Sequence, residues 1–143
     1  MLKGKRRSGF TLVEIMVVVV IIGMLAAIIG PRLSDNTDQA RITSTKTQIT
    51  QIENVLQMFH INNGFFPTTE QGLRALIEKP TIPPEPKNFP RGGYMNSKSL
   101  PKDAWGNEFI YKCPGENGDY DIISLGADGK EGGEGKNADI TNG

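Results

Sequence analysis

The hydrophobic and polar positions divide the chain into two parts. From Phe10 to Ile29 nearly every residue is apolar, with Thr11, Glu14 and Gly23 as interruptions, whereas the residues that follow are rich in Gly, Pro, Asn, Lys and Glu. A helix of about 20 residues is about 30 Å long, which is close to the thickness of the bilayer hydrocarbon. The pattern predicts a membrane-spanning helix followed by a part that folds in water.

A second helical pattern follows the apolar run. Its members recur every three or four positions, at Ile42, Thr45, Ile49, Ile52, Leu56 and Phe59. This period predicts that one long helix continues to about Asn62, where Gly64 suits the C-terminal cap. The Gly30–Pro31 pair should kink or locally unwind this helix. Because the stripe is too short for a coiled-coil seam over several heptads, we expect a small sheet to pack on it.

The rest of the pattern predicts short elements. Thr68 and Gln71 have the spacing of a capping box, and the apolar residues after them predict a short helix. That helix should end before the proline-rich stretch 80–93, which we expect to form an ordered or semi-rigid loop. Strands are predicted within 108–113 and 119–126. With about three short antiparallel strands beside helices, the chain is typical of an α+β fold.

Charge and the rare residue types exclude several classes of protein. The chain has 16 basic and 16 acidic residues, and no basic patch interleaved with aromatic residues follows its N-terminus, which argues against nucleic acid binding. The one cysteine, Cys113, permits no intramolecular disulfide and should pack in or beside a strand. The one histidine, His60, should lie at the end of the long helix without a metal or catalytic role. An N-terminally anchored enzyme is disfavoured, because neither a Gly-x-Ser-x-Gly motif nor a cysteine–histidine couple is present.

The residues before the apolar run are strongly basic. Lys3, Lys5, Arg6 and Arg7 all precede Gly9, with no acidic residue among them. The positive-inside rule places such a segment on the cytoplasmic side of a membrane. The apolar run also exceeds the roughly 7 to 15 residues of an ordinary secretory signal, which favours a membrane span.

Glu14 is the one charged residue in the apolar run. A carboxylate within a membrane span costs a few kcal/mol unless it is paired or lies near the interface. One interpretation is an interfacial carboxylate that reaches water and does nothing further. The other interpretation requires a partner cation. Cleavage after Gly9 would give Phe10 a new α-amino group, which could neutralise the Glu14 of a neighbouring copy in a low-dielectric core.

The stretch "KRRSGFTLVEIMVVVVIIGMLAAI" resembles the class III signal of type IV pilins and of type II secretion pseudopilins. The resemblance implies that a membrane-embedded prepilin peptidase cleaves after Gly9 and N-methylates Phe10. It also implies that Glu14 serves methylation and assembly.

The resemblance extends over nearly the whole chain. "FPTTEQGLRALIEKP", "GGYM", "LPKDAWGNEFIY" and "DYDIISLGADGKEGGEGKNADI" resemble the major pseudopilins of type II secretion systems. This implies a type IV pilin-like α+β fold, in which a long helix is half transmembrane and half packed against the small antiparallel sheet. The implied parts are a cleaved basic leader at 1–9, a transmembrane and assembly half at 10–30, and a periplasmic globular domain at 31–143.

The last loop, "SLGADGKEGGEGKNADI", combines glycines with acidic residues. Calcium takes oxygen ligands from carboxylates, backbone carbonyls and water, and glycines let carbonyls turn inward. From the residues alone a solvated acidic turn is the stronger interpretation, because the EF-hand spacing is absent. The resemblance instead implies a structural calcium ion. The ligands implied by the motif are the side chains of Asp128 and Asp139 and the carbonyls of Leu125, Ala127 and Lys130. Glu131 and Glu134 are spare carboxylates.

The resemblance implies that the chain is the major structural subunit of a periplasmic pseudopilus, a helical homopolymer that helps to export folded proteins across the outer membrane. The implied partners are other copies of the chain, prepilin peptidase, minor pseudopilins and the inner-membrane assembly platform. The implied location is the bacterial inner membrane, crossed once with the N-terminus cytoplasmic, and then the pseudopilus. The alternative is a type IV pilin-like surface or DNA-uptake fibre. Pilins generally close a C-terminal loop with a disulfide, however, and the single cysteine excludes that here.

Overall fold

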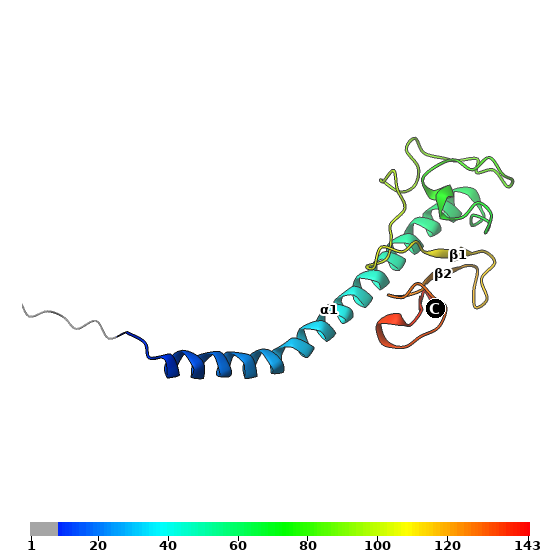
Figure 1. The fold of residues 1–143 in the computed structure, drawn as a ribbon. Helices are drawn as coiled ribbons and strands as arrows, with labels where there is room; N and C mark the ends of the chain where they lie inside the picture. The colour runs from blue at the N-terminus through cyan, green and yellow to red at the C-terminus, as the bar shows by residue number, and fades with distance from the viewer. Residues whose placement is uncertain (1–8) are drawn as a thin grey trace, which may run out of the picture. The chain divides into compact units, whose positions relative to one another are not determined.

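The long helix α1 comprises Leu12–Asn63, 52 residues in all (Figure 1). The computed structural model describes residues 9–143, and the side chains of residues 29–35 lie outside that description. The contacts divide the chain into a first unit that ends at Thr37 and a second unit, Asp38–Gly143. The predicted membrane and packed halves are therefore parts of one helix, whereas the predicted domain boundaries stay predictions.

Both ends of α1 follow from local sequence. The helix ends at Asn63, and Gly64 follows with a φ of 85°, its amide donating to the His60 carbonyl at 2.6 Å. A left-handed residue after the last turn is the usual glycine cap, so the predicted C-terminus is confirmed. The backbone stays helical through Gly30 and Pro31. The local unwinding expected there is absent, and a kink at this point stays a prediction.

The predicted short helix is smaller than expected. Thr68 and Gln71 form the predicted capping box, with the Gln71 amide donating to Thr68 Oγ1 at 3.2 Å and the Thr68 amide donating to Gln71 Oε1 at 3.1 Å. The box closes a turn, after which the 3₁₀ helix η1 comprises Leu73–Leu76. Gly72 separates the two with a φ of 61°, a positive value that a right-handed α-helix cannot contain. The sequence pattern therefore located the turn but not its helix type.

The sheet has three antiparallel strands in the order β1-β2-β3. The strands are β1 (Ile110–Lys112), β2 (Asp121–Ser124) and β3 (Ile140–Thr141). Tyr111 pairs with Ile122, and Ser124 pairs with Ile140. A second 3₁₀ helix, η2 (Gly135–Asn137), lies in the loop between β2 and β3. The α+β class and the small antiparallel sheet are as predicted.

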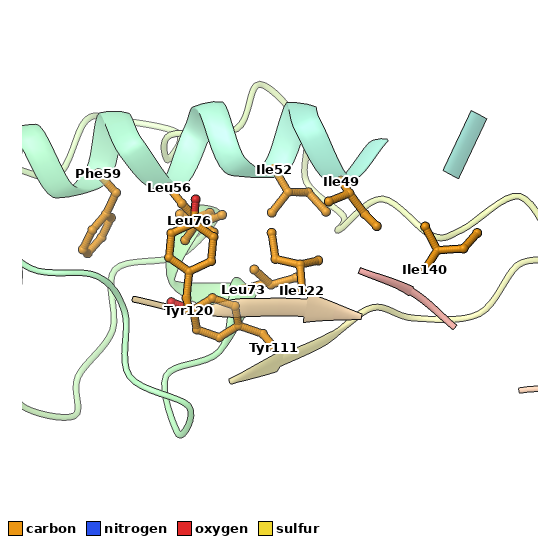
Figure 2. Packing of buried hydrophobic residues seen from close by; sticks show 10 residues of the cluster. All are labelled: Ile49, Ile52, Leu56, Phe59, Leu73, Leu76, Tyr111, Tyr120, Ile122 and Ile140. Atoms are coloured by element: carbon orange, nitrogen blue, oxygen red, sulfur yellow. The ribbon is translucent and has the colours of Figure 1, made fainter. Parts of the chain in front are cut away.

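The core lies between the sheet and the part of α1 that belongs to the second unit. Four stripe residues of α1 point toward side chains of the strands and of η1 (Figure 2). These four side chains are almost inaccessible: Ile49, Ile52, Leu56 and Phe59. Ile122 of β2 is also fully buried. Each such side chain contributes about 1.5–3 kcal/mol when removed from water, which makes this the principal apolar contact of the second unit. The stripe is thus a sheet-packing face, as predicted.

Three polar groups anchor the connections around this core. The Tyr111 hydroxyl donates to the Pro67 carbonyl at 2.8 Å, and burial raises the pKa of Tyr111 well above its ordinary value. His60 lies in the last turn of α1 and stacks on Phe66 at a ring separation of 4.3 Å. Cys113 follows β1, partly buried, with Sγ donating to the Asp119 carbonyl at 3.3 Å. Both rare residues therefore lie where the sequence analysis placed them.

Candidate functional sites: the N-terminal segment and the last loop

The N-terminal segment begins with a second capping box. The Thr11 amide donates to Glu14 Oε2 at 2.8 Å, and the Glu14 amide donates to Thr11 Oγ1 at 3.3 Å. The two side chains thus satisfy two amides that the first turn of a helix leaves without intrahelical partners. This role of Glu14 was not predicted, although Thr-x-x-Glu before an apolar run is its sequence signal.

The two residues of the predicted cleavage site lie before the helix. Gly9 and Phe10 are exposed, and Phe10 as a whole residue is 85% accessible. The carboxylate of Glu14 is also exposed, and Oε1 makes no hydrogen bond among the described residues. The basic residues of the predicted leader, Lys3 to Arg7, lie outside the described residues.

The helix after this box presents apolar side chains on every face. All large apolar residues from Leu12 to Ile28 are at least 50% exposed. A contiguous apolar surface of this extent marks a site of contact with lipid or with other protein. Among the described residues, no helix is both long enough and apolar enough to cross a membrane.

The last loop is closed by backbone contacts between its two halves. The Ala127 amide donates to the Lys136 carbonyl at 2.9 Å, and the Gly132 amide donates to Asp139 Oδ2 at 2.9 Å. Asp128 Oδ1 accepts from the Lys130 amide at 3.1 Å within the first half. Both carboxylates are exposed, and each keeps one oxygen without a hydrogen-bond partner among the residues that the structure describes.

Two glycines allow the halves of the loop to approach closely. A Cβ on Gly126 would lie 2.8 Å from the Lys136 carbonyl oxygen, and a Cβ on Gly133 would lie 2.5 Å from the Asn137 carbonyl oxygen. Both residues also have positive φ, 65° and 94°. These positions require glycine, because a side chain would be strained and would collide with backbone.

The oxygen donors of the loop fit a hard cation. The carbonyls of Leu125, Ala127 and Lys130 accept no hydrogen bond in the described part of the chain, so these three oxygens are available together with Asp128 and Asp139. Carbonyl and carboxylate oxygens are the donor set of calcium, and zinc would require nitrogen or sulfur ligands. The described residues contain no group of three or more His, Cys, Asp or Glu placed to hold a metal. A cation in the last loop would therefore need backbone carbonyls beside the carboxylates of Asp128 and Asp139.

The neighbouring charges are outside this donor set. Lys136 forms an ion pair with Asp38 of α1, with 3.5 Å between Nζ and Oδ2, which ties the loop to the helix. The exposed side chains of Glu131 and Glu134 make no contact with a described partner that would hold them toward the loop interior.

Both candidate sites lie in parts of the chain that match known protein families. Residues 32–143 match the family "Type II secretion system (T2SS), protein G", and residues 4–30 match the "Prokaryotic N-terminal methylation motif". The chain is 51% identical to the type II secretion system core protein G of Vibrio cholerae serotype O1, over 99% of this chain and 95% of the relative. It is 50% identical to the type II secretion system core protein G of Pseudomonas aeruginosa, over 99% of this chain and 98% of the relative.

A solved structure agrees with these relatives. The major pseudopilin of the type 2 secretion system of enterohaemorrhagic Escherichia coli matches with a TM-score of 0.68 and 41% identity, over 78% of this chain and 94% of that one. The match supports the pilin-like α+β fold that the resemblance implied. With a family match over residues 32–143 and relatives near 50% identity, the chain belongs to the type II secretion system protein G family of structural pseudopilin subunits.

Proposed function

We propose that this protein is the major structural subunit of a type II secretion pseudopilus. The observation that carries the proposal is an N-terminal methylation motif in which Gly9 and Phe10 are exposed, followed by a helix that is apolar on every face. Such a surface needs either lipid or neighbouring helices. In a precursor held in the membrane, lipid covers this helix. When the protein later polymerises, the helices of neighbouring copies cover it.

The processing step acts at the start of the helix. Prepilin peptidase cleaves after Gly9 and methylates the α-amino group of Phe10. The apolar run from Phe10 to Ile29 spans the inner membrane before assembly, with the basic leader cytoplasmic and the second unit periplasmic.

The assembly step uses the free oxygen of Glu14. Because Oε2 accepts from the Thr11 amide, Oε1 can accept from the α-amino group of Phe10 in a neighbouring copy while the cap stays in place. The Glu14 carboxylate and the α-amino group carry opposite charges, which attract each other strongly between packed apolar helices. The filament then contacts minor pseudopilins and the inner-membrane assembly platform, and it helps to move folded proteins through the outer membrane.

The first experiment is an intact-mass measurement on the protein recovered from membranes, with and without co-expressed prepilin peptidase. The expected product lacks residues 1–9 and carries one methyl group on Phe10. An uncut chain, or cleavage beyond the apolar run, would refute the processing step and with it the assembly role of Glu14.

The last loop is proposed to bind calcium as a structural ion. The donors would be the side chains of Asp128 and Asp139 and the carbonyls of Leu125, Ala127 and Lys130. The support is the fit of this oxygen donor set to a hard cation. Bound there, the ion would supply positive charge to these oxygens, while the chain itself supplies the close backbone approach at the loop glycines.

Thermal unfolding tests this second proposal. Chelation by EDTA should lower the Tm of the wild type, and Asp128→Ala should abolish the difference between calcium and EDTA. Glu131→Ala is the matched control, because it removes an exposed carboxylate of the same loop and should leave the difference intact. A wild-type Tm that does not respond to EDTA would refute the calcium site.

A further inference from the structure

A buried carboxylate outside the last loop accepts hydrogen bonds from residues that hold the start of that loop. Asp103 is only 5% exposed, and no basic side chain of the described residues forms an ion pair with it. Its Oδ1 accepts from the Trp105 amide at 3.0 Å and from the Asn107 amide at 2.8 Å. Its Oδ2 accepts from the Ser124 hydroxyl at 2.7 Å. A buried carboxylate is stable only when hydrogen bonds replace its water, so these donors are held firmly around it.

The residues bound to Asp103 contact Gly126 from both sides. The Gly126 amide donates to Ser124 Oγ at 3.3 Å, and the Gly126 carbonyl accepts from Asn107 Nδ2 at 3.0 Å. Ser124 is fully buried at the end of β2, so its hydroxyl cannot turn to water instead. Gly126 is therefore fixed at both its donor and its acceptor.

The planarity of the peptide bond transmits this constraint to the proposed ligands. The Gly126 amide and the Leu125 carbonyl belong to one peptide plane and point in opposite directions. Fixing the amide on Ser124 therefore fixes the direction of the Leu125 carbonyl. The next plane holds the Gly126 carbonyl and the Ala127 amide, and it is fixed by Asn107 and by the Lys136 carbonyl at 2.9 Å.

From this geometry we infer that Asp103 is a positioning residue for the cation of the last loop. It holds Ser124 and Asn107, these hold the two peptide planes beside Gly126, and the planes direct the Leu125 carbonyl. Asp103 itself does not bind the cation. The inference rests on the proposed calcium site and adds to it a control of affinity by a side chain more than twenty positions away from the loop in sequence.

The test is a calorimetric calcium titration of the full-length chain in detergent, paired with the Tm in EDTA. Asp103→Asn and the milder Ser124→Ala should each raise the Kd for calcium by about tenfold or more, as is typical when an outer hydrogen-bond partner of a metal site is lost. Asp121→Asn is the matched control. Asp121 Oδ2 also accepts a backbone amide, from Glu116 at 2.7 Å, but at the other end of β2, and its loss should leave the Kd unchanged.

The outcomes separate this inference from the calcium proposal. If the wild type binds calcium and Ser124→Ala binds it with the same Kd while its Tm in EDTA falls, the network only stabilises the fold and the inference is overturned. If the wild type itself gives no binding heat and no Tm response to calcium, the calcium proposal fails, and this inference with it. Ser124→Ala removes a single hydroxyl, so it keeps the test valid even where Asp103→Asn does not fold.

Discussion

Replacing Glu14 separates two roles that one carboxylate combines. Glu14→Gln removes the negative charge but keeps an amide oxygen that can accept from the Thr11 amide, since glutamine also forms capping boxes. Glu14→Leu removes both the charge and the cap. Thr11→Val removes the hydroxyl that accepts from the Glu14 amide and leaves the charge in place.

The expected magnitudes differ enough to be distinguished. Loss of a helix cap costs about 1 kcal/mol. An α-amino group left unpaired between packed apolar helices costs about 3–5 kcal/mol. Because about 1.4 kcal/mol is a factor of ten, Glu14→Gln should lower the association constant of the subunits by about a hundredfold to several thousandfold, and Thr11→Val only several-fold. Glu14→Leu should lower subunit association the most of the three variants, because it loses both the charge and the cap.

The assay measures the fraction of processed chain recovered in sheared filaments from cells that carry the secretion genes. Intact mass on the same cells verifies that leader cleavage still occurs, so that a defect in assembly is not mistaken for one in processing. Normal filaments from Glu14→Gln would refute the charge pair. A loss in Thr11→Val as large as that in Glu14→Gln would instead assign the effect of Glu14 to the helix cap.

Three further predictions concern the second unit. Gly126→Ala should lower the Tm clearly more than Gly64→Ala, because both have positive φ but only the Gly126 Cβ would meet backbone atoms, at 2.8 Å and 2.9 Å. Tyr111→Phe should lose about 1 kcal/mol of stability with its buried hydrogen bond. Burial raises the pKa of Tyr111 in the folded state. The contribution of Tyr111 to the free energy of unfolding is therefore complete below the unfolded-state pKa of about 10 and should fall as the pH rises above that value. Unfolding curves measured at increasing pH would show this as a shrinking difference in stability between the wild type and Tyr111→Phe. Gln71→Ala should destabilise the chain by about 1–3 kcal/mol in urea unfolding, because the buried amide holds two carbonyls of the proline-rich loop, whereas the exposed Glu70→Ala should be neutral.

Periodic burial is the part of the fold that the sequence predicts best. The stripe that includes Ile52 and Leu56 is buried as its spacing indicated, because a helix repeats every 3.6 residues and one face must meet the sheet. The helix type of the 73–76 segment was not predictable from spacing alone. There a single glycine, Gly72, adopts a left-handed φ and ends the turn before an α-helix can form.

The polar contacts divide in the same way between local and distant ones. The Thr11–Glu14 box joins residues three positions apart, so its signal is present in the local sequence. The bonds of Asp103 join residues up to 21 positions apart, through a sheet register that no local pattern specifies. The motif therefore named the proposed ligands of the last loop, and only the structure showed what holds them.

The shortness of β3 has a consequence for the order in which the second unit opens. This strand has two residues, and the loop that connects it to β2 has 15, since residues 125 to 139 lie between Ser124 and Ile140. Closing such a loop costs chain entropy that two residue pairs barely offset. A cation bound as proposed would reduce that cost by joining the loop to itself, so its removal should release β3 first. In hydrogen exchange, the amides of β3 should then lose protection before those of β1 and β2.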